Sequence, residues 1–125
     1  MSKRVLVIDD EEDIGLLFGV ALKNEVNSGK IQLDFLLNAK DALDFLQEKS
    51  VDLIFCDINM PIMDGITLIK ELRTLDDYKY IPILMLTTES TSDKKQQGKS
   101  AGATGWIVKP FNPDQLLATI NKVLG

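Results

Sequence analysis

The sequence predicts an α/β fold in which a parallel β-sheet is covered by helices on both faces. Strand-like apolar runs alternate with segments of helical periodicity along the whole chain. Most of these runs are nearly continuous, which is typical of strands that are buried on both faces. With 125 residues and 45% hydrophobic content, the chain is expected to form one domain over residues 1–125, without an output domain.

Five segments have the composition of strands. They are residues 4–9, 31–37, 52–57, 82–87 and 105–108. Four of them are nearly continuous apolar runs and are predicted to lie in the interior of the sheet. The second alternates between apolar and polar residues from Ile31 to Phe35, which favours an edge strand with one partly solvated face.

The first three helices are marked by apolar stripes or start signals. The first has apolar residues at helical spacing, namely Ile14, Leu17, Phe18, Ala21 and Leu22. Asn38, with Asp41 three residues later, is a favourable cap for the second helix. Asp64 and Gly65 open the third. Residues 23–30, between the first helix and the second strand, are expected to form a surface loop.

The last two helices differ in their apolar content. The final helix has a strong start signal, because Asn112 can cap it, Pro113 fits its first position and Gln115 can complete a capping box. The segment from Ser90 to Ser100 contains no large apolar residue and carries Gly98 in its interior. Because such a helix can bury little, we predict that it is mobile and the least stable element. The alternative is a solvent-facing helix without functional mobility.

The composition excludes several classes of function. A formal net charge of -5, from 14 basic and 19 acidic residues, argues against a general nucleic-acid-binding protein. No apolar run approaches transmembrane length. The single cysteine, Cys56, lies in a strand-like run, which predicts a buried, unreactive thiol and is compatible with a reducing cytoplasm. Because the chain contains no histidine, any phosphohistidine chemistry must come from a partner.

Charged residues stand where the predicted strands end. Asp9 and Asp10 follow the first apolar run. Asp57 ends the third, and Lys109 follows the last. Because the carboxyl ends of parallel strands meet at one crevice, these groups are expected to converge there. Thr87 ends the fourth strand, so its hydroxyl is expected to reach the same crevice.

This set of residues predicts phosphoryl transfer to a carboxylate. Crowded acids repel one another unless a cation intervenes, and oxygen ligands without histidine or thiolate suit Mg²⁺ or Mn²⁺. Asp57 is then the nucleophile, Lys109 and the metal neutralise charge, and Thr87 senses the product. Two simpler interpretations stay open. Asp9 and Asp10 can cap the first helix, and Lys109 can form a buried ion pair with Asp57.

The ordered motifs resemble the receiver domain of two-component response regulators, and the resemblance covers the whole chain. The motifs are Asp9-Asp10, Asp57 with Met60-Pro61 and Asp64-Gly65, Thr87, and Lys109-Pro110. Residues 102–111, together with Thr87-Thr88-Glu89, are most similar to stand-alone chemotaxis regulators of the CheY type. The resemblance implies a flavodoxin-like, three-layer fold with five helices and a parallel sheet of order 2-1-3-4-5.

The resemblance also implies how the phosphoryl group and the metal are held. Asp57 accepts the phosphoryl group from a phosphohistidine of a sensor kinase, and Lys109 contacts it. Mg²⁺ is held by Asp10, Asp57 and the main-chain carbonyl of Asn59, whereas Asp9 acts through water. The protein is then a signalling phosphoacceptor with its own autophosphorylation and autodephosphorylation chemistry, and not an enzyme that acts on external substrates.

A conformational switch is implied as well. In the family, Thr87 and the aromatic residue at position 106 move after phosphorylation, which alters the face formed by the last two helices and the last strand. Asn59 and Glu89 are expected to modulate dephosphorylation. Position 106 is usually Tyr or Phe, and Trp106 departs from this pattern, so a partly buried strand aromatic is its simpler role. The Lys109-Pro110 bond is expected in cis.

The implied partners are a sensor histidine kinase of the chemotaxis type, a flagellar motor switch protein or another response target, and a phosphatase. The protein is expected to be a cytoplasmic monomer that binds no nucleic acid and does not enter the membrane. A phosphorelay shuttle or a kinase regulator is the alternative within the family. A metal-dependent aspartyl phosphohydrolase would need a second acid where Asn59 stands. A flavodoxin-type electron carrier would need a glycine- and hydroxyl-rich loop in place of residues 9–12.

Overall fold

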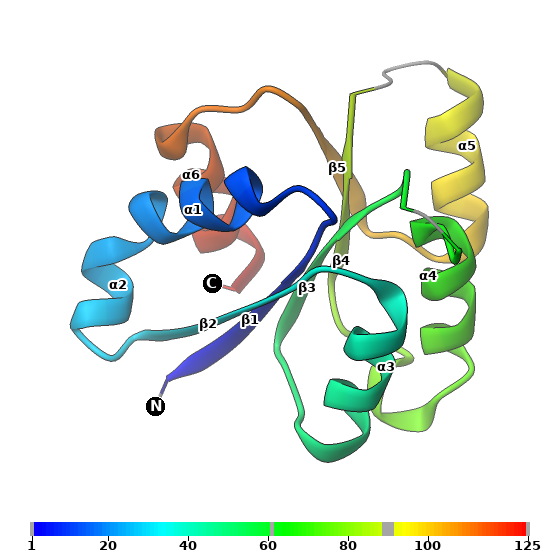
Figure 1. Ribbon diagram of the computed structural model, residues 1–125, viewed down its shortest axis with the longest axis horizontal. Coiled ribbons are helices and arrows are strands. Elements are labelled where there is room, and N and C mark those ends of the chain that lie inside the picture. The colour runs from blue at the N-terminus through cyan, green and yellow to red at the C-terminus, as the bar shows by residue number, and fades with distance from the viewer. Residues whose placement is uncertain (1, 61, 89–91, 125) are drawn as a thin grey trace.

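The computed structural model shows a central sheet between two layers of helices (Figure 1), and it describes residues 2–60, 62–88 and 92–124. The strands are β1 (Lys3–Ile8), β2 (Ile31–Leu36), β3 (Leu53–Asp57), β4 (Ile83–Thr87) and β5 (Gly105–Val108). The helices are α1 (Glu12–Ala21), α2 (Lys23–Asn27), α3 (Ala39–Glu48), α4 (Gly65–Arg73), α5 (Ser92–Ala101) and α6 (Pro113–Leu124). A 3-10 turn spans Asp76–Tyr78.

All five strands are parallel, and their order is β2-β1-β3-β4-β5. The predicted fold class and strand order are confirmed, and each predicted strand boundary lies within one residue of the observed one. The register places Ile8 beside Cys56, and Asp57 beside Leu86. The carboxyl ends of the central strands therefore lie at one edge of the sheet.

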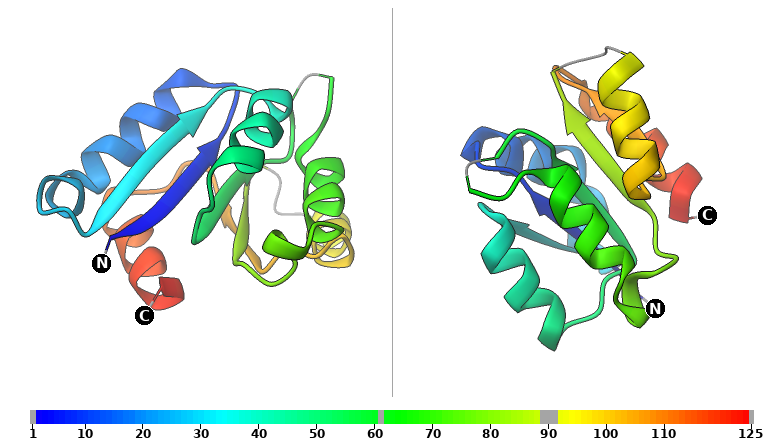
Figure 2. Two further views of the ribbon diagram at one scale, coloured as in Figure 1. Left: turned by 90° about the horizontal axis from the view of Figure 1, so that it is seen from below. Right: turned by 90° about the vertical axis from the view of Figure 1, so that its right-hand side faces the viewer.

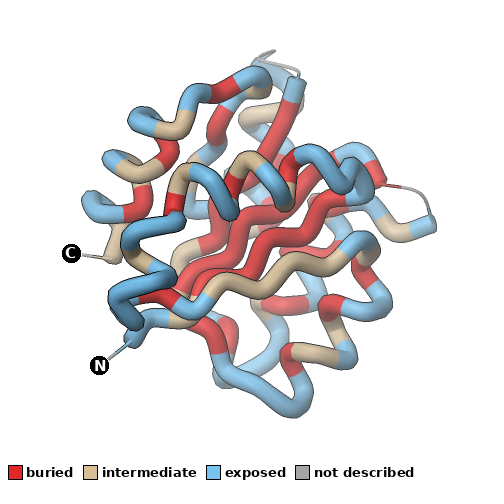
Figure 3. The backbone as a smooth tube through the Cα atoms, turned by 60° about the vertical axis from the view of Figure 1, so that its left-hand side comes forward, coloured by how far each residue is buried: buried red, intermediate tan, exposed pale blue. Residues whose placement is uncertain are grey.

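Two hydrophobic cores lie on opposite faces of the sheet. Helices α1 and α6 cover one face, and α3, α4 and α5 cover the other (Figures 1 and 2). Phe18 of α1 packs edge-on against Phe55 of β3, with ring centroids 4.9 Å apart. On the other face, Leu68 and Leu72 of α4 are fully buried. The central strands are buried along their lengths, whereas the helices alternate buried and exposed positions (Figure 3).

The prediction that residues 105–108 form an interior strand is wrong. An open sheet has two edges, and the observed order gives them to β2 and β5. Trp106 and Val108 are accordingly 41% and 37% exposed. An apolar run can therefore belong to an edge strand when neighbouring helices cover only part of it. The prediction that residues 31–37 contain an edge strand is confirmed, since β2 is at the other edge of the sheet.

Residues 23–30 are not simply a surface loop. The main chain leaves the helical conformation at Leu22, whose side chain is buried, and a second short helix, α2, follows at once. The described residues thus form six α-helices where five were expected. No residue of α2 is buried. The loop is limited to residues 28–30, where Gly29 adopts a φ of +81° that glycine allows without strain.

The predicted helix starts are confirmed by hydrogen bonds. The side chain of Asn38 accepts a bond of 2.8 Å from the Asp41 N–H, and the Asn112 side chain accepts one of 2.6 Å from the Gln115 N–H. Helix α5 forms as predicted with Gly98 and Ala101 as its buried residues, while its mobility stays a prediction. Among the residues that the structure describes, no helix is long and apolar enough to cross a membrane.

Candidate functional site

Three carboxylates converge at the carboxyl ends of β1 and β3, as predicted. Oxygen atoms of Asp9, Asp10 and Asp57 lie within 4.8 Å of one another. Asp9 is fully buried and Asp57 is 3% exposed, whereas Asp10 is exposed to solvent. Because β1 and β3 are adjacent and parallel, the residues that end them must lie side by side. The convergence therefore follows from the topology of the sheet.

Lys109 brings a positive charge to these acids. Its ammonium nitrogen lies 2.8 Å from Asp9 Oδ2, and 3.7 Å from both Asp57 Oδ2 and Glu11 Oε1. The Lys109 N–H donates to the Thr87 carbonyl over 2.7 Å, and the Lys109-Pro110 bond is cis as expected. Sequence reasoning paired Lys109 with Asp57 but missed Asp9, its nearer partner. That partner is a hundred residues away, and only the register of the strands reveals it.

Burial controls the ionisation of Asp57. Loss of water around its carboxyl group raises the pKa of Asp57 to about 7, and the negative charge of Asp9 adds to this effect. The Asn59 N–H, which donates to Asp57 Oδ1 over 3.1 Å, and the charge of Lys109 act in the opposite direction. A carboxyl group with this pKa needs added positive charge to be fully ionised at neutral pH.

Lys109 remains a cation in the same surroundings. Burial acts to lower the pKa of its ammonium group, but the nearby carboxylates of Asp9, Asp57 and Glu11 outweigh burial and raise the pKa. Its side chain is 8% exposed, so the charge is held close to the acids instead of in bulk solvent. The site therefore has a fixed positive group beside a carboxyl group that is difficult to ionise.

The acidic cluster fits a hard divalent cation. Asp9 Oδ2 is buried and, within the described residues, has no hydrogen-bond partner in addition to its ion pair with Lys109. Such an oxygen can accept a bond from a metal-bound water. The donors are carboxylate oxygens without imidazole or thiolate, which suits Mg²⁺ or Mn²⁺. Asp9, Asp10 and Asp57 are thus able to hold such an ion.

The interpretation of Asp9 and Asp10 as caps of the first helix is not supported. The N-cap of α1 is Glu11, and no side chain caps this helix by a hydrogen bond. Asp9 Oδ1 instead accepts a bond of 2.9 Å from the Glu11 N–H, in the turn before the helix. This bond orients the Asp9 carboxylate so that its other oxygen meets Lys109. Asp9 therefore belongs to the charged site.

The remaining predicted residues lie at different distances from the cluster. Thr87 is 2% exposed at the end of β4, the strand next to Asp57. Asn59 is exposed and follows Asp57 closely in the chain. Trp106 lies on the outer strand β5, under the ammonium group of Lys95 at 4.8 Å from the ring centroid. Glu89 falls outside the described residues.

Gly65 is a site-forming residue that sequence reasoning did not explain. Its N–H donates to the Ile58 carbonyl over 3.2 Å. A Cβ atom at this position would overlap the carbonyl oxygen of Asp57 and lie 2.8 Å from the Cα atom of Ile58. Only glycine lets α4 begin against the main chain that carries the phosphoacceptor candidate. The sequence signal is the pair Asp64-Gly65, since Asp64 caps the helix by accepting from the Thr67 N–H over 2.8 Å.

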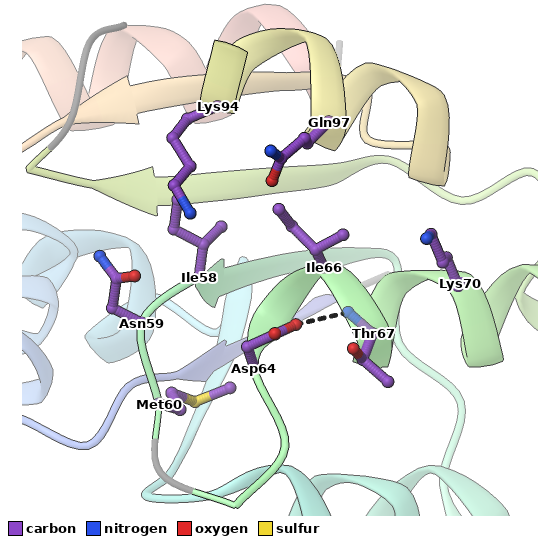
Figure 4. Close-up of a pocket in the computed structure, with 9 residues that line it drawn as sticks. All are labelled: Ile58, Asn59, Met60, Asp64, Ile66, Thr67, Lys70, Lys94 and Gln97. Atoms are coloured by element: carbon purple, nitrogen blue, oxygen red, sulfur yellow. Dashed lines mark hydrogen bonds between the residues drawn. The ribbon is translucent and has the colours of Figure 1, made fainter.

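A polar groove opens beside the acidic cluster, between α4 and α5 (Figure 4). Its volume is about 510 Å³, and its lining includes Asn59, whose N–H donates to the Asp57 carboxylate. Lys70 of α4 and Lys94 and Gln97 of α5 line its two walls. Because α5 forms one wall, the width of the groove depends on a helix whose buried residues are only Gly98 and Ala101.

Comparison with known proteins identifies the family. The profile of the response regulator receiver domain matches residues 5–121. The chain belongs to the response regulator receiver family. Its fold is that of a receiver domain of two-component systems. The chain is 36% identical over 124 residues to the regulatory protein VanR of Enterococcus faecium, covering 99% of this chain and 51% of VanR.

Other relatives show two kinds of organisation. The transcriptional regulatory protein PrrA of Mycobacterium tuberculosis is 32% identical over 98% of this chain, which covers 50% of PrrA. The receiver thus spans about half the length of the curated relatives that it matches. A structure of the chemotaxis protein CheY4 of Vibrio cholerae is 40% identical, with a TM-score of 0.90, covering 98% of this chain and 99% of CheY4.

Proposed function

We propose that this receiver accepts a phosphoryl group on Asp57 from a phosphohistidine of a sensor kinase, in a reaction that depends on Mg²⁺. The supporting observation is the convergence of Asp57 with Asp9, Asp10 and Lys109 in a chain that has no histidine of its own. In the transfer, an oxygen of Asp57 forms a bond to phosphorus while the phosphorus–nitrogen bond of the donor breaks. The imidazole of the donor leaves and takes up a proton.

The residues around Asp57 have complementary roles in this proposal. Asp10, Asp57 and the main-chain carbonyl of Asn59 would hold Mg²⁺, and Asp9 would act through water. The ion supplies positive charge that favours the ionised form of Asp57 and balances the phosphoryl oxygens. Lys109, now 2.8 Å from Asp9 and 3.7 Å from Asp57, is close enough to contact a phosphoryl oxygen after a small movement.

Phosphorylation would then be transmitted to the surface formed by α5, β5 and α6. Thr87 would sense the phosphoryl group, and its position at the end of the strand next to Asp57 supports this role. Trp106 would respond on β5, and the sparse packing of α5 supports movement of that helix. Asn59 and Glu89 would modulate autodephosphorylation, as in the family, and the exposed side chain of Asn59 close to Asp57 supports this for one of the two.

The output that we propose is chemotaxis signalling, with a chemotaxis-type kinase upstream and a flagellar motor switch protein downstream. The 40% identity to the chemotaxis protein CheY4 of Vibrio cholerae supports this output. The matches to the regulatory proteins VanR and PrrA favour other response targets in two-component signalling, including a phosphorelay or kinase-regulating role. Asn59, in place of a second acid, argues against a phosphohydrolase that turns over external substrates.

Intact mass spectrometry tests the phosphoacceptor proposal. With Mg²⁺ and a small phosphodonor, the wild type is expected to gain one phosphoryl group, and chelation of the metal is expected to abolish the gain. Asp57→Asn should remove the adduct, whereas the matched control Asp44→Asn, which changes an exposed acid of α3, should retain it. An adduct that persists in Asp57→Asn would show that another residue is the acceptor. Binding of the activated form to candidate targets then separates the output roles.

A further inference from the structure

Helix α5 is attached to the sheet without a large apolar side chain. Its buried residues are Gly98 and Ala101. A Cβ atom at Gly98 would overlap the sulfur atom and terminal methyl group of Met85, so the helix backbone lies directly on this β4 side chain. Because glycine and alanine bury little apolar area, packing alone holds α5 weakly against the sheet. Individual polar contacts therefore contribute more to the position of this helix than they would for a helix with a large apolar face.

Lys95 makes one of these contacts. Its ammonium nitrogen lies 4.8 Å from the ring centroid of Trp106 on β5. Lys95 is half-buried, and Trp106 is 41% exposed. Tryptophan is the aromatic side chain that attracts cations most strongly, because the face of its ring carries negative charge density. The contact joins α5 to the outer strand of the sheet.

Trp106 connects α5 to the charged site through the backbone. It pairs with Met85 in the register of β4 and β5, so both strands lie under the helix at this level. The strand that contains Trp106 continues into Lys109, whose ammonium nitrogen is 2.8 Å from Asp9. Because Trp106 and Lys109 are three residues apart, a movement of either residue displaces the same short segment of chain. Lys95 of α5 contacts this segment through the indole.

We propose that Lys95 is a positioning residue that holds Trp106 and α5 in the resting arrangement and so opposes activation. The proposal rests on the proposed function, because the resting arrangement is the one that phosphorylation of Asp57 changes. A cation–π contact at a partly exposed site corresponds to about a two- to fivefold change in an equilibrium. Loss of the Lys95 charge is expected to favour the activated arrangement by this factor.

The fluorescence of Trp106, the only tryptophan, tests the resting contact directly. Lys95→Met removes the charge and keeps an unbranched apolar stem. Lys99→Met makes the same change one turn later on α5, at an exposed position. Without Mg²⁺ or phosphodonor, Lys95→Met is expected to increase acrylamide quenching, whereas Lys99→Met and the charge-retaining Lys95→Arg should match the wild type. Equal quenching of Lys95→Met and Lys99→Met would overturn the proposal.

Activation is tested with beryllofluoride, which imitates a phosphoryl group. In the presence of Mg²⁺, the half-saturating concentration is expected to fall about two- to fivefold in Lys95→Met and to stay unchanged in Lys99→Met. Equal values in the two variants would contradict a role for Lys95 in opposing activation. Intact mass after treatment with a small phosphodonor separates the two proposals. If no variant gained an adduct, the proposed function would fail, while the quenching comparison would still decide whether Lys95 holds Trp106.

Discussion

Arg73 is predicted to be the most important single polar side chain for the stability of the α4–α5 side of the protein. Its guanidinium group donates to the carbonyls of Gly102, Tyr78 and Ile81, over 2.7 to 3.0 Å. These carbonyls belong to the end of α5, the 3-10 turn and the approach to β4. One side chain thus joins three segments that are separated in the sequence.

The expected cost of Arg73→Met follows from these bonds. A hydrogen bond from a charged donor contributes about 1.5–3 kcal/mol, and each lost partner leaves a carbonyl to be satisfied by solvent. Because Arg73 is only half-buried and water can reach part of this site, we take a value below this range, about 1 kcal/mol for each bonded carbonyl. For three carbonyls, we expect a loss of about 3 kcal/mol in the free energy of unfolding. This value would lower the urea midpoint by about 1.5 M.

Urea denaturation followed by circular dichroism measures this loss. Lys70→Met is the matched control, because Lys70 is exposed, lies on the same helix and carries the same charge. It is expected to change the free energy of unfolding by less than about 0.5 kcal/mol. Hydrogen exchange should also show faster exchange at the end of α5 in Arg73→Met than in Lys70→Met. Equal urea midpoints for the two variants would refute the assignment of Arg73 as the link between these segments.

Three further predictions concern other residues. Ile62 is fully exposed and has a φ of 70°, a conformation that is costly for a β-branched residue. Ile62→Asn should therefore raise the free energy of unfolding, measured by urea titration, by about 1 kcal/mol. A lower free energy of unfolding would contradict the presence of strain at this residue. Tyr78→Phe should lower the free energy of unfolding by about 1–2 kcal/mol, because the buried Tyr78 hydroxyl donates to the Leu46 carbonyl of α3 over 2.6 Å. An unchanged urea midpoint would show that this hydrogen bond does not contribute to stability. Burial raises the pKa of Asp57 from 3.8 to about 7, so the unfolded chain loses this proton at a lower pH than the folded protein does. The metal-free wild type should therefore lose stability relative to Asp57→Asn as the pH rises from about 4 to about 7. The difference should reach at most about 4 kcal/mol at pH 8 and shrink when Mg²⁺ is added, which thermal unfolding at pH 4 and pH 8 can measure; parallel pH curves for the two proteins would contradict the raised pKa.

The parts of the site that sequence predicted are those that follow from strand ends. The sequence predicted that Asp9, Asp10 and Asp57 lie close together, because the carboxyl ends of parallel strands lie at the same edge of the sheet. Helix caps such as Asn38 were also predictable, because a cap depends on residues only three positions apart. Such signals are local, and they require only the right class of fold.

The parts that sequence did not predict depend on contacts between distant segments. The preference of Lys109 for Asp9 over Asp57 is decided by strand register and by a turn that orients the Asp9 carboxylate. The exposure of Trp106 is decided by the position of β5 at the edge, which its apolar sequence concealed. The links made by Arg73 join carbonyl groups, which every residue possesses and no sequence pattern marks.

The close approach of Gly65 to the main chain of Asp57 has a mechanical consequence. The first turn of α4 lies directly against the peptide that follows Asp57, and no side chain at Gly65 separates the two main-chain segments. The end of β3 and the start of α4 therefore behave as one rigid support behind the carboxylate. We therefore expect a group added to Asp57 to displace the chain on the other side, toward β4, β5 and α5, whose buried residues are Gly98 and Ala101.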